Sequence, residues 1–238
     1  FYIKNHEIRK KNADLSMKKA SDTCYIIGNG PSLKSIDLTK LHGDTMVTNF
    51  FYKFDHGTNF QPSFYFLIDE QFYFESHSQD VKNVISYFPE TNLVLNGLYR
   101  ERIINLLPKT IKTNFLYIWN GSMRKSKKLD CTKLLPAINN VVGTAICMAL
   151  YMNYKKIILI GCDFSSFASV KDAHCYNVGS VERSISLAYE LFNYSLVAKS
   201  HEVLQEFAET HNIKIYNATQ GSLIDAYERI PSHDLERV

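Results

Sequence analysis

The sequence lacks several features that would settle a class of function at once. It has no run of about 20 apolar residues, so nothing in its 238 residues predicts a membrane-spanning helix. Neither sign of charge predominates, because 27 Lys and Arg face 24 Asp and Glu, and this balance excludes a dedicated nucleic-acid binder. The five cysteines are scattered without a C-x-x-C pair, which indicates a reduced, cytosolic protein.

Common catalytic motifs are also missing. No G-K-[ST] follows the glycines as a P-loop requires, and no G-x-S-x-G of a serine hydrolase occurs. A D-x-D cation site is incomplete, because Asp163 is followed two positions later by Ser165. Asp69 and Glu70 are adjacent, so in a strand they would point to opposite faces. The histidines lack zinc spacing, and a site without a metal is therefore expected.

Aromatic rings, in contrast, are abundant, with 15 Phe, 15 Tyr and 1 Trp making 13% of the chain. Some of them stand beside asparagine rather than inside Val and Ile runs, as in N-F-F-Y at residues 49–52. We expect Phe50, Phe51, Tyr52 and Tyr176 to adjoin a ligand site, and the rings at residues 64–66 to belong to a buried strand.

The ends and the charges suggest an organisation. Residues 1–20 are polar and basic and begin with Phe, so we expect a linker from a larger protein, followed by one nucleotide-sugar-binding catalytic domain over residues 21–238. A second basic stretch would suit an anionic substrate or a membrane surface, although a solvated face is the simpler interpretation. It contains Arg100, Arg102, Lys109, Lys112, Arg124, Lys125, Lys127 and Lys128.

Apolar runs alternate with helical patterns along the chain. Strands are predicted at residues 23–27, 45–49, 63–68, 92–95, 115–118, 156–160 and 213–216. Helices are predicted at residues 31–41, 78–88, 98–107, 142–153, 181–211 and 219–228. This order predicts an α/β fold, a single Rossmann-like domain with a mostly parallel sheet flanked by helices, in a GT-A-like variant. The loop after the strand at 156–160 has about 16 residues, a length typical of functional loops.

The first strand-to-helix turn, G-N-G-P-S at residues 28–32, is the most informative motif. Such a turn brings the main chain and a helix N-terminus to a phosphate, which would meet Gly28, Gly30 and Ser32. The dinucleotide fingerprint fails, because Leu33 stands at its third glycine and Asn49 at its acidic position. A turn that serves only to start a helix is the alternative explanation.

Polar residues follow several predicted strands, and the carboxyl ends of parallel strands share one edge of a sheet, where ligands bind. They are Asn29, Asn49, Asp69, Asp163 and Asn217. Within the long loop, His174 is a candidate general base for a hydroxyl nucleophile, with Asp172 as an orienting partner. A solvated loop histidine is the alternative.

The order of these motifs resembles bacterial sialyltransferases of glycosyltransferase family 42. The resemblance rests on residues 26–34, 49–52, 143–145 and 157–164, and it spans about residues 23 to 230. Residues 213–223 also resemble a wider group that includes 6-hydroxymethylpterin diphosphokinase-like proteins and flagellin-glycosylating factors.

The resemblance implies a CMP-activated nonulosonic acid as donor substrate, transferred with inversion and without metal or cofactor. It implies that Asn29 and Asn49 contact the donor's phosphate and sugar, that Asp69 takes the place of a family Asn near the donor, and that His174 deprotonates the acceptor. Gly143 and Thr144 would hold the nucleotide through main-chain N–H groups. The resemblance completes the donor site with Gly28, Gly30, Ser32, Asp163 and Tyr176.

The chain also departs from the family pattern. Family tyrosines after G-x-D-F are replaced by Ser165, Ser166 and Phe167, which leaves Tyr176 as the nearby phenol. In the family's H-Y-x-x-H stretch the second histidine is the base, whereas His174 matches the first and Val178 stands at the second.

The implied function is a sialyltransferase-like glycosyltransferase of bacterial lipopolysaccharide or capsule biosynthesis. Its partners would be the CMP-sugar and a glycan acceptor, and a lipid-linked acceptor would bring this cytoplasmic protein to the inner face of the membrane. A homo-oligomer is also compatible with the sequence. The alternatives are a diphosphokinase-like phosphotransferase with ATP and magnesium, or a non-catalytic domain of a surface-polysaccharide enzyme.

Overall fold

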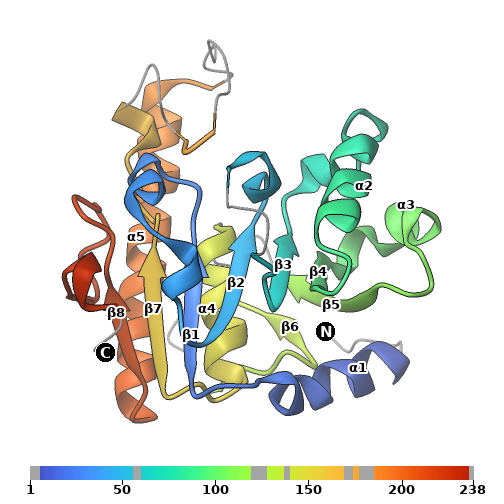
Figure 1. Ribbon diagram of the computed structural model, residues 1–238, viewed down its shortest axis with the longest axis horizontal. Helices are drawn as coiled ribbons and strands as arrows, with labels where there is room; N and C mark the ends of the chain where they lie inside the picture. Colours follow the sequence, from blue (N-terminus) through green and yellow to red (C-terminus); the bar gives the residue numbers. More distant parts are fainter. Residues whose placement is uncertain are drawn as a thin grey trace.

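A computed structural model describes residues 6–55, 60–118, 128–136, 140–168, 174–176 and 185–235. These residues form one sheet of nine strands in the order β6-β5-β4-β3-β2-β1-β7-β8-β9, with every neighbouring pair parallel (Figure 1). The strands are β1 (Thr23–Ile27), β2 (Asp44–Thr48), β3 (Phe64–Leu67), β4 (Asn92–Asn96), β5 (Lys112–Ile118), β6 (Leu134–Leu135), β7 (Lys156–Ile160), β8 (Lys214–Asn217) and β9 (Glu228–Arg229). The predicted α/β fold with a parallel sheet is thus confirmed.

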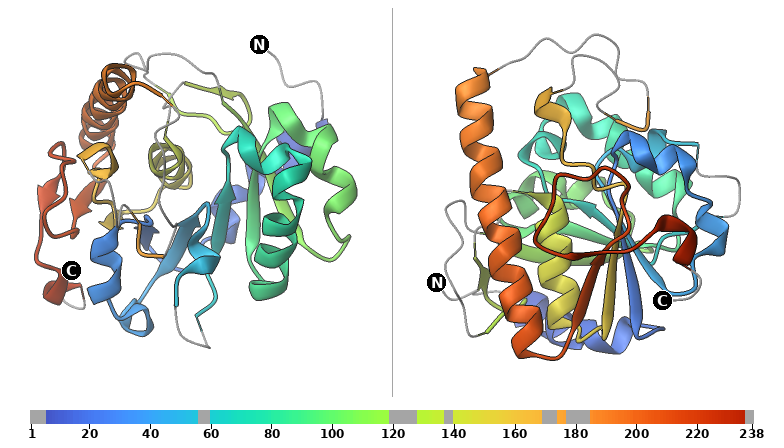
Figure 2. Two further views of the ribbon diagram at one scale, coloured as in Figure 1. Left: turned by 90° about the horizontal axis from the view of Figure 1, so that it is seen from above. Right: turned by 90° about the vertical axis from the view of Figure 1, so that its left-hand side faces the viewer.

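Helices cover both faces of the sheet. They are α1 (His6–Ala13), α2 (Ser78–Tyr87), α3 (Arg100–Ile103), α4 (Val141–Tyr151) and α5 (Leu187–Thr210). Alternate side chains of a strand point to opposite faces, so Ile26 belongs to the core on the face of α4 and α5, and Ile27 to the core on the face of α2. Helices α4 and α5 lie side by side on one face (Figure 2). No helix in the described part of the chain is long and apolar enough to cross a membrane.

The described part of the basic N-terminal segment packs against the sheet. Helix α1 contacts β5, and the fully buried amide of Asn12 donates hydrogen bonds of 2.8 Å to the carbonyls of Phe115 and Cys131. Leu15, just after this helix, is also fully buried. Burial of these two side chains joins residues 6–18 to the core of the sheet.

Several predicted helices differ from the structure. The one predicted over residues 219–228 is wrong, because side chains there bind the main chain instead: Thr219 N donates to Asn217 Oδ1 at 3.0 Å and Ile224 N to Ser222 Oγ at 3.1 Å. Gly221, at φ +72°, also interrupts a helix. Residues 31–41 form two short 3-10 turns, and residues 98–107 form α3 between two more. Of the predicted helix 181–211, residues 181–184 lie outside the described residues and α5 begins at Leu187.

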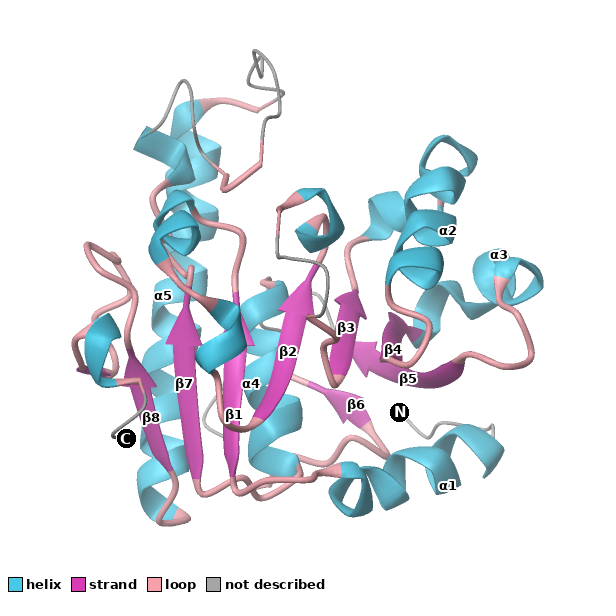
Figure 3. Cartoon of the chain, viewed as in Figure 1, coloured by secondary structure: helices cyan, strands magenta, loops and turns pink. Residues whose placement is uncertain are grey.

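The strand order reverses beside β1. From β1 the chain adds β2 to β6 on one side and then crosses to add β7 to β9 on the other. The carboxyl ends of β1, β2 and β7 point to the same edge (Figure 3). In open parallel sheets a ligand crevice forms where the strand order reverses, so the gap between the loops after β1 and β7 is the expected place for a site.

Candidate functional site

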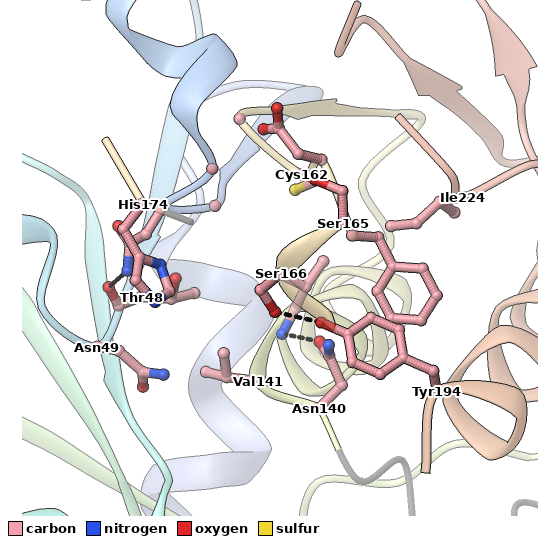
Figure 4. Close-up of a pocket in the computed structure, with 17 residues that line it drawn as sticks. Thr48, Asn49, Asn140, Val141, Cys162, Ser165, Ser166, His174, Tyr194 and Ile224 are labelled. Atoms are coloured by element: carbon pink, nitrogen blue, oxygen red, sulfur yellow. Dashed lines mark hydrogen bonds between the residues drawn. The ribbon is translucent and has the colours of Figure 1, made fainter. Parts of the chain in front are cut away.

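A pocket lies at this edge of the sheet (Figure 4). The turns after β1, β2 and β7, the start of α4, the side chain of Tyr194 on α5 and the loop residue His174 contribute to its wall. Six of the predicted site residues line it, namely Gly28, Asn29, Gly30, Asn49, Asp163 and His174. Among the described residues, no group of three or more His, Cys, Asp or Glu is arranged to hold a metal ion.

The glycines of the first turn allow it to approach the end of β7 closely. Gly28 N donates to Ile160 O at 2.9 Å, and Gly30 N donates to Gly161 O at 2.8 Å. A Cβ atom on Gly28 would lie 2.4 Å from Gly161 O, and one on Gly30 would lie 1.8 Å from Asp163 Oδ2. The close contact between the two turns therefore explains both glycines without a ligand.

The carboxylate of Asp163 occupies the place that a phosphate would take at the start of the 3-10 turn Pro31–Ser35. Ser32 donates from its main-chain N to Asp163 Oδ1 at 3.2 Å and from its hydroxyl to Asp163 Oδ2 at 2.6 Å. These are the donors that the sequence assigned to a phosphate. In this structure Asp163 holds them, so Ser32 reaches the pocket only through Asp163.

Asn29 presents one unpaired oxygen. Its side-chain Nδ2 donates to Thr48 O at 2.8 Å, and its main-chain carbonyl accepts from Cys175 N at 2.8 Å. Its Oδ1 is buried and has no hydrogen-bond partner. A buried acceptor without a donor is unfavourable, which makes this atom a candidate ligand contact.

Asn49 presents a second such oxygen. The residue has a left-handed backbone at φ 50°, a conformation that asparagine tolerates well. Its Nδ2 donates to Asp69 Oδ2 at 2.6 Å, and its buried Oδ1 has no partner. Burial raises the pKa of Asp69, while hydrogen bonds from Asn49 and Gln71 oppose the shift.

His174 lies beside these amides on an aromatic support. Its ring stacks on Tyr176 with centroids 5.1 Å apart and planes 2° from parallel, and Tyr176 meets Phe50 edge-on at 6.2 Å. Burial lowers the pKa of His174 below 6.5, against a hydrogen bond to the main chain of Asn29. The imidazole is therefore neutral at pH 7 and can accept a proton. The predicted partner Asp172, like Val178, lies outside the described residues.

Phe51, Tyr52 and the thiol of Cys175 are held by contacts within the protein or are buried. Phe51 is fully buried in the core, and the Tyr52 hydroxyl donates to Asp80. Burial raises the pKa of Cys175 to about 12, so its thiol is unreactive at neutral pH. Of the four rings predicted near the site, Phe50 and Tyr176 are the ones that support His174.

The start of α4 differs from the prediction. Asn140 caps the helix, because its Oδ1 accepts from Val142 N at 2.7 Å and Gly143 N at 3.2 Å. Thr144 N donates to Asn140 O at 3.1 Å, and Thr144 is buried. The main-chain donors of Gly143 and Thr144 are thus already used, and it is Asn140, Val141 and Val142 that line the pocket. An Asn before an apolar helical run was the signal for this cap.

Two hydroxyl groups were missed by the sequence reasoning. Tyr194 of α5 forms a hydrogen bond with Ser166, and both line the pocket (Figure 4). The ring of Tyr194 lies 4.4 Å from that of Phe164, which has φ 58°. The pocket wall therefore holds a phenol from a distant helix, in addition to Tyr176 behind His174. Nothing in the helical pattern around Tyr194 separates it from a core aromatic.

No protein-family model matches the sequence, and no curated protein matches it. Solved structures do match the fold. The sialyltransferase CstII from Campylobacter jejuni, in complex with cytidine-5′-monophosphate, matches with a TM-score of 0.52 and 18% identity over 88% of this chain and 85% of that chain. Its complex with CMP-3FNeuAc gives a TM-score of 0.54 at 17% identity, over 88% and 87%.

A larger enzyme matches as well. MAf glycosyltransferase from Magnetospirillum magneticum AMB-1 has a TM-score of 0.56 and 13% identity, over 96% of this chain but 38% of that one. The chain thus has a glycosyltransferase fold like that of CstII, at identities that establish the fold alone.

Proposed function

We propose that the protein is a metal-independent, inverting glycosyltransferase that moves a sialic-acid-like sugar from a CMP-activated donor to a hydroxyl of a glycan acceptor. The fold likeness to CstII, crystallised with CMP and with CMP-3FNeuAc, supports the choice of donor. The observation that carries the proposal is the pocket where the strand order reverses, because it holds the neutral imidazole of His174 together with two unpaired asparagine oxygens.

In the proposed reaction, His174 accepts the proton of the acceptor hydroxyl while that oxygen attacks the anomeric carbon. The bond between the anomeric carbon and the phosphate oxygen breaks, and CMP leaves with the electron pair. Attack from the face opposite CMP inverts the configuration. Ser166 and Tyr194 share one hydrogen bond, and the hydroxyl that accepts it would donate its own proton to the leaving phosphate, in place of the family tyrosines. A general base of this kind contributes about 100- to 10,000-fold in rate.

Isothermal titration with CMP, CMP-sialic acid, and ATP with magnesium tests the donor. We expect binding of the two cytidine ligands, whereas tight ATP binding without a response to CMP would replace this proposal with a phosphotransferase. No binding of any nucleotide would indicate a non-catalytic domain. If CMP-sialic acid is turned over, His174→Ala should lower kcat by about 100-fold or more. The matched control is His233→Ala, because the His233 side chain is 79% exposed and lies outside the pocket.

A further inference from the structure

The protein itself holds all but one of the hydrogen-bonding groups of Asn49. Its main-chain N donates to Phe66 O at 2.8 Å, and its main-chain carbonyl accepts from the Tyr65 hydroxyl at 2.7 Å. Its side-chain Nδ2 donates to Asp69 at 2.6 Å. Backbone and side chain are therefore both fixed, and the buried Oδ1 is the atom left for a ligand.

Asp69 decides which end of the Asn49 amide is left without a partner. The oxygen and the NH₂ group of an amide are similar in size, so shape alone does not orient them. Asp69 Oδ2 accepts from the NH₂ group of Asn49, and this bond turns Oδ1 of Asn49 away from Asp69. Without an acceptor at position 69, the amide of Asn49 could present either end to a ligand.

Asn29, in the neighbouring loop after β1, is oriented in the same way by an acceptor that takes its NH₂ group. The carbonyl of Thr48, the residue just before Asn49, accepts from Asn29 Nδ2 at 2.8 Å, and Asn29 Oδ1 is again buried without a partner. Both residues line the pocket from adjacent loops, and each has one fixed, buried acceptor without a partner. A ligand that satisfies both must bring hydrogen-bond donors, and the ionised phosphate of a CMP-sugar brings none.

We propose that Asp69 is a positioning residue, which makes Asn49 act together with Asn29 as a site for the hydroxyl groups of a sugar ring. The proposal rests on the proposed function and assigns these amides to hydroxyls rather than to the donor's phosphate. Two rings of the donor carry such hydroxyls, the ribose of CMP and the transferred sugar. In both cases the protein would discriminate against a ligand that lacks the hydroxyl, because a buried amide oxygen would stay unpaired.

Titration calorimetry with matched ligand pairs tests this inference. One arm compares CMP with 2′-deoxy-CMP and 3′-deoxy-CMP, and the other compares CMP-sialic acid with analogues that lack single hydroxyls of the transferred sugar. We expect the wild type to bind one deoxy ligand about tenfold more weakly than its parent. In Asp69→Leu the ratio of the dissociation constants of the deoxy ligand and its parent should fall below about twofold, because the amide of Asn49 is no longer oriented. In Asp69→Asn the new amide offers both an acceptor and a donor to Asn49, so the ratio should lie between those of the wild type and Asp69→Leu.

Two further variants control the comparison. Asn49→Gly suits φ 50° and removes the amide, so it should abolish the ratio even if Asp69→Leu does not fold. Asp80→Leu, which removes a carboxylate bonded to Tyr52 outside the pocket, should keep the wild-type ratio. The inference is wrong if CMP binds but no deoxy analogue is weakened in either arm, or if Asp69→Leu and Asn49→Gly keep the ratio. Failure of every cytidine ligand to bind would instead refute the proposed function.

Discussion

The contact between Gly30 and Asp163 allows a quantitative test of the fold at the site. Gly30 has φ −70° and ψ 158°, a conformation that alanine adopts freely, so Gly30→Ala adds no backbone strain. Its new Cβ would, however, lie 1.8 Å from Asp163 Oδ2 and 2.4 Å from the carboxyl carbon. The Asp163 side chain must move, and both of its hydrogen bonds from Ser32 are then lost.

The expected cost follows from those two bonds. A hydrogen bond to a charged group contributes about 1.5–3 kcal/mol when buried, and Asp163 is only half-buried, so we take the sum as about 3 kcal/mol. For a chain of this size each kcal/mol lowers Tm by about 2–4 °C, which predicts a decrease of about 6–12 °C for Gly30→Ala.

A double-mutant cycle shows whether the clash is the cause. Urea unfolding would be measured for the wild type, Gly30→Ala, Asp163→Gly and the double variant, because the Cβ of Asp163 itself lies 2.8 Å from the new Cβ at position 30. We expect the double variant to match Asp163→Gly, which is a coupling free energy of about 3 kcal/mol. Gly221→Ala, at φ +72° with no atom within 4 Å of the new Cβ, is the control, and its cost should be independent of Asp163. A cost of Gly30→Ala that persists without the carboxylate would refute this reasoning.

Three more outcomes follow from other parts of the structure. Burial lowers the pKa of His201 to about 4, so the unfolded chain, with a pKa near 6.5, binds the proton more tightly and stability falls as the pH drops from 6.5 toward 4. Between pH 7 and pH 5 the wild type should lose about 2 kcal/mol more than His201→Gln in urea unfolding, and equal losses would contradict the assignment. Asn140→Ala should cost about 0.5–2 kcal/mol through the lost cap of α4, and Asn140→Asp should recover most of it in the same assay. Because the pKa of His174 in the free protein lies below 6.5, the acid limb of a kcat/KM–pH profile should have its midpoint below pH 6.5, and a midpoint above 7 would exclude His174 as the base.

The sequence predicts the central sheet well, because its strands are short apolar runs that end at glycine, asparagine or aspartate. The predicted strand at residues 156–160 has the same bounds as β7, for example. The pattern fails where side chains compete with the main chain, as Asn217, Thr219 and Ser222 do in the loop predicted as a helix. It also misses β6, which has two residues and therefore no periodicity to detect.

The sequence predicts the site residues that follow the ends of strands. It does not predict which side chains of the site form hydrogen bonds with one another. Asn29, Asn49 and His174 were named from their positions, and the structure brings them to one pocket. The sequence does not show that Asp163 takes the donors of Ser32, because the pairing joins residues 131 positions apart. Tyr194 enters from α5 for the same reason, through a tertiary contact that no local pattern encodes.

The contact between the turns after β1 and β7 also limits the order in which substitutions at positions 30 and 163 can occur during evolution. A side chain at position 30 is excluded for as long as the Asp163 carboxylate keeps its place. A lineage that replaces Asp163 with glycine is free to fill position 30 afterwards, because the Cβ of Asp163 is also only 2.8 Å from a Cβ there. The same step releases the two donors of Ser32 for an external anion. Homologues should therefore fall into two groups, one with glycine and aspartate together and one in which the aspartate was lost first. A homologue that combines a β-carbon at position 30 with an aspartate at 163 would need a different path for the main chain between β1 and the following turn.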